Sequence, residues 1–256
     1  MDHIAKITGQ LPEYGLDAML VTSAPGERYA VGFEGEGWVL VSRDGAHYST
    51  DGRYIEAARH QVTGAEIVLA ERGRSHLALA REEIQRRGLK RVGFESGRVS
   101  ADELERWRGG LPCELVAAQG LLDGLRAAKD DEELARMRQA QRITDEAFQE
   151  ILNFIRPGLT EQEVAARLVY ELLRRGGRKV SFDPIVAAGA NGSMPHAVPG
   201  EMVLQSGMFV TMDFGCVYEG YCSDMTRTVA VGQPTEEMER VYHTVLEAQR
   251  AGISAA

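Results

Sequence analysis

The chain has 256 residues, of which 44% are hydrophobic and 26% charged, a composition typical of globular proteins and a length that allows two domains with separate cores. Its net charge of −9 and the lack of a basic stripe in the sequence argue against nucleic acid as a partner. The sequence has neither an apolar run of the ~20 residues that cross a bilayer nor a secretory signal at its start, so we expect no membrane partner and a cytoplasmic protein.

Residues 1–122 are predicted to form an α/β domain, because short apolar strands alternate there with helical patterns. The predicted strands are residues 16–22, 38–42, 46–50, 65–70, 91–95 and 113–118. Asp44-Gly45 indicates a hairpin turn between the second and third strands. Helices are expected over 75–87, ending before Gly88, and after Ser100, which can form a capping box with Glu103.

The composition becomes charged and helical near residue 122, which predicts a second domain over 123–256. A long helix is expected to begin at Asp130 or Asp131 and to end at Pro157-Gly158. Thr160 and Glu163 form a second capping box that opens the next helix. Two groups of residues carry no predicted chemistry. The histidines His47, His60 and His76 are expected on the surface. Cys113, Cys216 and Cys222 are expected as free thiols, and Cys216 and Cys222 as packing residues.

A β-hairpin is predicted from two apolar, β-branched runs, 208–215 and 221–231, joined by Val217-Tyr218-Glu219-Gly220. A turn centred between Tyr218 and Glu219 would pair Asp213 directly with Asp224. Carboxylates opposed in this way repel each other, since their Cβ atoms lie roughly 4.5–5.5 Å apart. A shared proton would relieve the repulsion, and so would two divalent cations about 3.5–4 Å apart in a hydrolytic site.

We favour cations between Asp213 and Asp224. The alternative is two solvated aspartates on an edge hairpin, which is the usual position of a strand aspartate. Asp213, however, interrupts the apolar run MFVTMDF, where a charge is costly unless it is paired. His196 lies between Pro195 and Pro199 in the loop NGSMPHAVPG, and its spacing alone does not decide its role.

Two parts of the sequence resemble a known family. The segment FDPIVAAGANGSMPHAVPG, followed by VTMDFGCVYEGYCSDMTRTVAVG, is similar to the proline-specific metallopeptidases, which are the Xaa-Pro dipeptidases and Xaa-Pro aminopeptidases with a pita-bread catalytic fold. The segment LDAMLVTSAPGERYAVGFEGEGWVLVSRDGAHYSTDGRYIEAA resembles the creatinase/prolidase N-terminal domain. The resemblance therefore covers essentially the whole chain, and its DFG…SDMTRT core is the more specific part.

The resemblance implies a fold class, a site and partners. An α/β creatinase/prolidase-like domain over 1–122 would be followed by the first part of an α+β pita-bread domain over 123–256. Asp213 and Asp224 would be two of five ligands of two divalent metal ions, and His196 would act near the scissile bond. A carboxylate-rich shell favours Mn²⁺, with Co²⁺ or Zn²⁺ as alternatives. The implied partners are a peptide substrate and a second copy of the chain in a homodimer.

The implied function is hydrolysis of the bond before proline, in Xaa-Pro dipeptides or in peptides that begin with Xaa-Pro. The family's other ligands, a histidine and two glutamates, are expected beyond Ala256, so we expect the chain to be a fragment of a longer protein. The alternative function is a non-catalytic pita-bread module that binds peptides or a protein. Intact Asp213 and Asp224 argue against that module.

Overall fold

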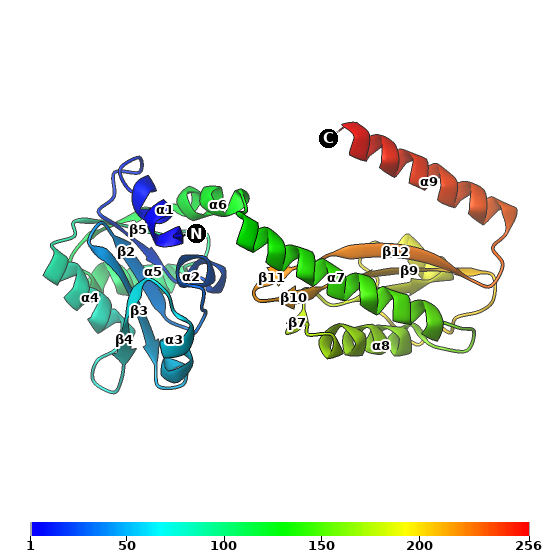
Figure 1. Cartoon of the computed structure of the whole chain (residues 1–256), viewed down its shortest axis with the longest axis horizontal. Coiled ribbons are helices and arrows are strands. Elements are labelled where there is room, and N and C mark those ends of the chain that lie inside the picture. Colours follow the sequence, from blue (N-terminus) through cyan, green and yellow to red (C-terminus); the bar gives the residue numbers. More distant parts are fainter. Residues whose placement is uncertain (1, 256) are drawn as a thin grey trace. The chain divides into compact units, whose positions relative to one another are not determined.

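The computed structural model describes residues 2–255 and divides the chain into two compact units, Met1–Asp130 and Asp131–Ala256 (Figure 1). The division falls where helix α7 begins. The predicted boundary at residue 122 lies inside helix α6 (Gln119–Ala127), which belongs to the first unit. Among residues 2–255, no helix combines the length and the apolarity needed to span a membrane.

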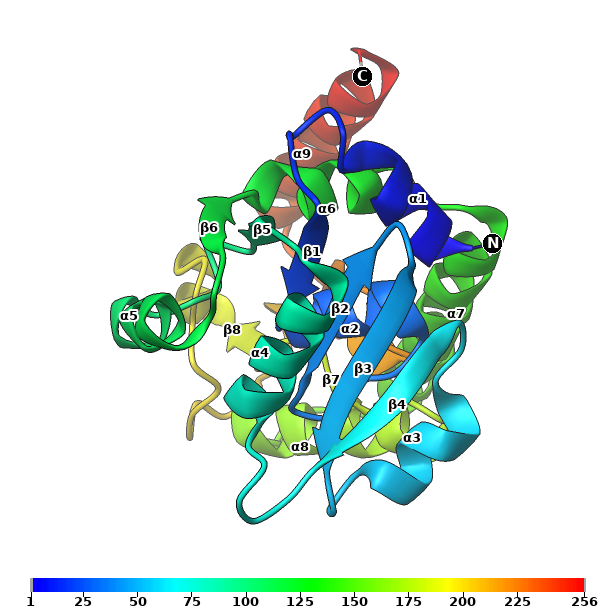
Figure 2. The same cartoon turned by 90° about the vertical axis from the view of Figure 1, so that its left-hand side faces the viewer.

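A six-stranded mixed sheet forms the centre of the N-terminal unit, in the order β4-β3-β2-β1-β5-β6 (Figure 2). Its strands are β1 (Ala18–Val21), β2 (Trp38–Ser42), β3 (Gly45–Asp51), β4 (Ala65–Ala70), β5 (Arg91–Phe94) and β6 (Glu114–Ala117). The pairs β1–β2 and β2–β3 are antiparallel, and the other pairs are parallel. All six predicted strands of this domain are confirmed.

Helices cover both faces of this sheet. One face packs against α1 (His3–Gln10), α2 (Ala24–Val31), α3 (Ile55–Gln61) and α6, and the other against α4 (His76–Arg87) and α5 (Ala101–Gly110). Strand β1 shows why two cores form, because its side chains alternate between the faces. Met19 and Val21 join the first core, and Ala18 and Leu20 join the second. Both faces are therefore buried.

The hairpin between β2 and β3 turns one residue earlier than predicted. Ser42 pairs with Gly45, so the central turn residues are Arg43 and Asp44. Gly45 is the first residue of β3, where its φ of 108° lies in the region that favours glycine. The Asp44-Gly45 pair correctly predicted a hairpin, but Gly45 is the first residue of the strand and is not a central residue of the turn.

Two antiparallel sheets and three helices form the C-terminal unit (Figure 1). One sheet has the order β12-β9-β8 and the other β11-β10-β7. The strands are β7 (Lys179–Val180), β8 (Ile185–Ala188), β9 (Met208–Phe214), β10 (Cys216–Tyr218), β11 (Tyr221–Cys222) and β12 (Met225–Val231). The helices are α7 (Asp131–Phe154), α8 (Glu161–Arg174) and α9 (Glu236–Ala255), with a 3-10 turn, η1 (Gly189–Ser193), after β8.

The core of this unit lies between the strands and helices α7 and α8. Val210, Met212 and Phe214 of β9 are fully buried there, next to residues such as Ile143 of α7 and Leu168 of α8. The predicted capping box is confirmed: Thr160 accepts from Glu163 N, and the Glu163 side chain accepts from Thr160 N. Helix α9 contributes no buried residue to this core.

A buried carboxylate holds the loop that leads into β2 in the N-terminal unit. Glu27, in α2, is 1% exposed and accepts hydrogen bonds from Gly35 N at 3.0 Å and Gly37 N at 3.1 Å. A side chain could not replace the hydrogen of Gly37, because its Cβ would lie 1.7 Å from Ser49 O. Burial raises the pKa of Glu27 to about 7.

This raised pKa predicts how stability depends on pH. Between pH 4.5 and about 7 the folded unit holds a proton on Glu27 that the unfolded chain releases. The free energy of unfolding should therefore fall as the pH rises through this window, by about 3 kcal/mol in total. Urea unfolding followed by tryptophan fluorescence measures it, because both tryptophans, Trp38 and Trp107, are buried in this unit. Glu27→Gln should flatten the profile, and an unchanged profile in that variant would contradict the assignment.

Candidate functional site

The hairpin that carries the two aspartates turns one residue later than predicted. Glu219 and Gly220, with φ of 46° and 85°, are its central residues, and Tyr218 pairs with Tyr221. Two-residue hairpin turns with positive φ at both positions match the twist of the strands. Asp213 therefore pairs with Thr226, so the predicted direct pairing with Asp224 is wrong.

The two carboxyl groups are neighbours nonetheless. Moving the turn by one residue shifts the pairing by two, and side chains alternate between faces with a period of two. Asp224, directly before β12, therefore stays on the face of Asp213, diagonally across the hairpin. Partial burial and the nearby negative charge of Asp213 raise the pKa of Asp224. Thr226 Oγ1 also donates to Asp213 Oδ1 at 2.9 Å.

A close contact between the two strands fixes the backbone beside Asp224. A Cβ on Gly215 would lie 2.0 Å from Ser223 O, so only glycine allows this approach. Ser223 is 4% exposed, and its Oγ accepts from Cys216 N at 3.0 Å and hydrogen-bonds Thr144 Oγ1 of α7 at 2.6 Å. The residue before Asp224 is thus anchored to the helix from the core side.

Polar side chains lie around Asp213 on its face of the sheet, next to the apolar Ile185 of β8 that pairs with Asp213. Thr211 lies two residues before Asp213 on β9, and its Oγ1 is 2.9 Å from Oγ1 of its partner Thr228. Hydroxyl and carboxylate oxygens thus line this face, while the other face of β9 is buried. Oxygen donors of this kind suit hard divalent cations. The donor set fits metal ions, which Asp213 and Asp224 would hold.

His196 lies in the loop between η1 and β9 and is exposed, next to the buried Ala197. The loop begins beside the polar face, since a Cβ on Gly192 would lie 3.9 Å from Thr211 Oγ1. Sequence reasoning did not identify Thr226 as the hydrogen-bond donor to Asp213. Thr226 lies in the SDMTRT segment, but the predicted register, misplaced by the turn, did not pair it with Asp213.

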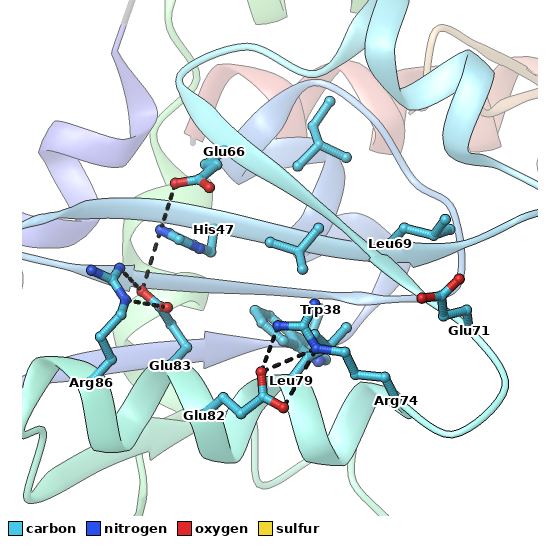
Figure 3. Close-up of a pocket in the computed structure, with 12 residues that line it drawn as sticks. Trp38, His47, Glu66, Leu69, Glu71, Arg74, Leu79, Glu82, Glu83 and Arg86 are labelled. Carbon is cyan, nitrogen blue, oxygen red and sulfur yellow. Dashed lines mark hydrogen bonds and ion pairs between the residues drawn. The ribbon is translucent and has the colours of Figure 1, made fainter.

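A cavity of about 520 Å³ lies in the N-terminal unit, beside β3, β4 and α4 (Figure 3). None of the predicted site residues lines it. Its charged groups pair with one another: Arg74 with Glu82 at 2.6 Å, and Nε2 of His47 with Glu83 at 3.3 Å. His47 is 7% exposed, so its predicted surface position is wrong. It lies on β3 opposite α4, and burial lowers its pKa.

The cysteines confirm the predicted free thiols but only in part the predicted packing role. All three are free thiols, as expected. Cys216 is fully buried in the core, whereas Cys222 is exposed, so the packing role predicted for Cys222 is wrong. The reason is the alternation of side chains along the strand, because the next residue, Ser223, faces α7 and bonds Thr144, which leaves Cys222 on the opposite face.

Comparison with known proteins assigns this chain to a family. Residues 135–256 match the model of metallopeptidase family M24, and residues 3–128 match the creatinase/prolidase N-terminal domain. An uncharacterized peptidase of Bacillus subtilis, YqhT, is 39% identical over 99% of this chain and 71% of its own length. The chain belongs to metallopeptidase family M24. Membership of M24 implies divalent metal ions, a peptide substrate and the pita-bread fold for the second unit.

Solved structures agree with the M24 assignment. An Xaa-Pro dipeptidase from Bacillus anthracis superimposes with a TM-score of 0.91 and 38% identity, covering 97% of this chain and 70% of the other. An X-Pro aminopeptidase from Thermotoga maritima gives a TM-score of 0.85 and 31% identity, covering 92% and 68%. The predicted fold class, an α/β N-terminal domain followed by pita-bread structure, is confirmed.

The close contact at Gly215 should make the C-terminal unit sensitive to any side chain at this position. Gly215→Ala should lower the free energy of unfolding of the C-terminal unit by about 3 kcal/mol, because the new Cβ must separate the two strands. Gly252→Ala is the matched control, since nothing lies within 4 Å of its Cβ position in α9, and should stabilise by at most about 1 kcal/mol. Urea unfolding followed by NMR signals of β9 and β12 measures both. Equal stability of the two variants would contradict the proposed strand contact.

Proposed function

We propose that this chain provides metal ligands and a substrate-side histidine to a peptidase that hydrolyses the bond before proline. The substrates would be Xaa-Pro dipeptides or peptides that begin with Xaa-Pro. The observation that carries the proposal is the proximity of Asp213 and Asp224, which lie on one face of the hairpin and close enough for the charge of Asp213 to raise the pKa of Asp224. The names of the Bacillus anthracis dipeptidase and the Thermotoga maritima aminopeptidase support the substrate class.

Each residue has a proposed role. Asp213, oriented by Thr226, and Asp224 would hold the divalent ions. When bound, such ions polarise the scissile carbonyl and lower the pKa of water. His196, exposed in its loop, contacts the substrate near the scissile bond. The two aspartates are only part of the ligand set, because hard divalent cations take about six or more donors.

Three finer features belong to the same proposal. Mn²⁺ is the favoured ion because both assigned ligands are carboxylates, with Co²⁺ or Zn²⁺ as alternatives. The protein is proposed to act as a homodimer, which light scattering of the native polypeptide tests. The similar structures include both a dipeptidase and an aminopeptidase, so the proposal covers both substrate lengths.

Removing one carboxylate tests the metal site. In the native polypeptide, Asp224→Asn should lose at least about 100-fold in affinity for Mn²⁺ and lose Xaa-Pro hydrolysis, because one of the two proposed carboxylate ligands becomes neutral. Metal content by elemental analysis and proline release are the measurements. Asp145→Asn is the matched control, since Asp145 is an exposed residue of α7 bonded only to Gln141 among the contacts described. Turnover retained in Asp224→Asn would end the proposal.

Replacing the histidine tests the catalytic role separately. His196→Ala should lower kcat for Xaa-Pro substrates by roughly 100-fold, the usual contribution of a positioned acid–base or polar group. Its metal content should equal that of the wild type, because His196 is not a proposed ligand. An unchanged kcat would remove His196 from the site and leave the metal assignment intact. If the wild-type polypeptide binds metal and peptides but does not hydrolyse the peptides, the result would support the non-catalytic module.

A further inference from the structure

The first residue of α8 carries a buried carboxylate that receives three hydrogen bonds. Glu161 is 1% exposed. Its Oε1 accepts from Ala188 N at 2.7 Å and from Asn191 Nδ2 at 2.9 Å. Its Oε2 accepts from Gly200 N at 3.1 Å. All three donors lie 27 to 39 residues further along the chain, so helix capping does not explain them.

These donors mark the two ends of the segment that carries His196. Ala188 is the last residue of β8, and Asn191 lies in η1 directly after it. Gly200 ends the loop on the other side. Three residues lie between His196 and Gly200, and four lie between Asn191 and His196. The carboxylate of Glu161 therefore joins both ends of the loop, one through each of its oxygens.

Backbone contacts strengthen the connection to α8 at only one of these ends. Gln162 N donates to Gly200 O at 3.1 Å, and Glu161 N donates to Met202 O at 3.1 Å. Towards the other end, the hydrogen bonds described between α8 and the segment are the two to Oε1 of Glu161, beside the apolar packing of α8 on β8. The side chain thus links the two ends of the loop by hydrogen bonds.

Because Glu161 is buried, its carboxylate depends on these three hydrogen bonds. A buried carboxylate is costly unless hydrogen bonds compensate it, and hydrogen bonds to a charged acceptor are stronger than neutral ones. Its place in the first turn of α8 also suits a negative charge, because helix N-termini are positive. The loop ends cannot separate without leaving this charge uncompensated.

We propose that Glu161 is the positioning residue of the His196 loop, which it clamps at both ends so that His196 is held beside the face carrying Asp213. The inference rests on the proposed function for the role of His196 alone. The clamp itself is a property of the fold and can be tested without any catalytic assay.

The structural test compares Glu161→Gln with Glu163→Gln by NMR hydrogen exchange. Glu163 is the matched control, because it lies in the same helical turn but is exposed and bonds only to Thr160 among the contacts described. Glu161→Gln should speed exchange of the Ala188 and Gly200 amides by roughly 10- to 100-fold. It should also shift the imidazole signals of His196, while amides of β9 and β12 keep their protection. Unchanged exchange at Ala188 and Gly200 would overturn the clamp.

A milder variant keeps the test decisive if Glu161→Gln does not fold. Asn191→Ala removes one donor and leaves two backbone bonds to the carboxylate. It should shift the His196 signals and speed exchange at Ala188 by several-fold, since each such bond contributes up to about tenfold. Identical spectra for Asn191→Ala and the wild type in the loop would contradict the inference.

The catalytic test uses the native polypeptide and an Xaa-Pro peptide. Glu161→Gln should lower kcat by at least about tenfold with metal content unchanged, and the double variant with His196→Ala should be no slower than His196→Ala alone. Additive losses would show that Glu161 acts independently of His196 and would overturn the positioning role. If the wild type does not hydrolyse the peptide, the proposed function fails, while the exchange measurements still decide the clamp.

Discussion

The close contact of two strands at Gly215 is the constraint on which the proposed site depends. It brings the backbone of residue 215 against Ser223 O and leaves Asp213 and Asp224 on one face, where the charge of Asp213 raises the pKa of Asp224. Ser223 is in turn bonded to Thr144, so the long helix α7 fixes the strand from behind. The position of two like charges is therefore determined by neutral, buried groups that titration and metal binding leave unchanged.

The same strands contribute to the core with one face and to the proposed site with the other. On β9, residues 210, 212 and 214 fill the core, and residues 211 and 213 carry the polar oxygens. The loop with His196 begins at the end of β8, the neighbouring strand, and Glu161 reaches its two ends from α8. The strands and helices that form the core, β8, β9 and α8 among them, thus also position the proposed site residues.

Much of this organisation could be predicted from the sequence, and the errors have physical causes. Both hairpins were correctly predicted but were misplaced by one residue, because glycine with positive φ occurs in the turn at Gly220 and just after it at Gly45. A one-residue error in a turn moves the pairing by two, which preserves the face. The proximity of Asp213 and Asp224 was therefore correctly predicted from an incorrect pairing.

Other features lay outside the reach of local patterns. Helices α1 to α3 are short, and α2 contains Pro25 and Gly26 close to its start, so tertiary packing and not periodicity supports them. The burial of His47 depends on Glu66 and Glu83, which come from other elements. Glu161 stood inside a correctly predicted capping box, but its partners are distant in sequence, and nothing nearby distinguishes it from Glu163.

The neighbouring carboxylates have a consequence for evolution. Like charges held side by side weaken the fold that holds them, and neither Asp213 nor Asp224 contributes to the hydrophobic core. A descendant released from selection for the chemistry would gain stability by replacing either residue with a neutral one. Under the proposed function, selection for activity maintains both carboxylates and opposes selection for a more stable protein.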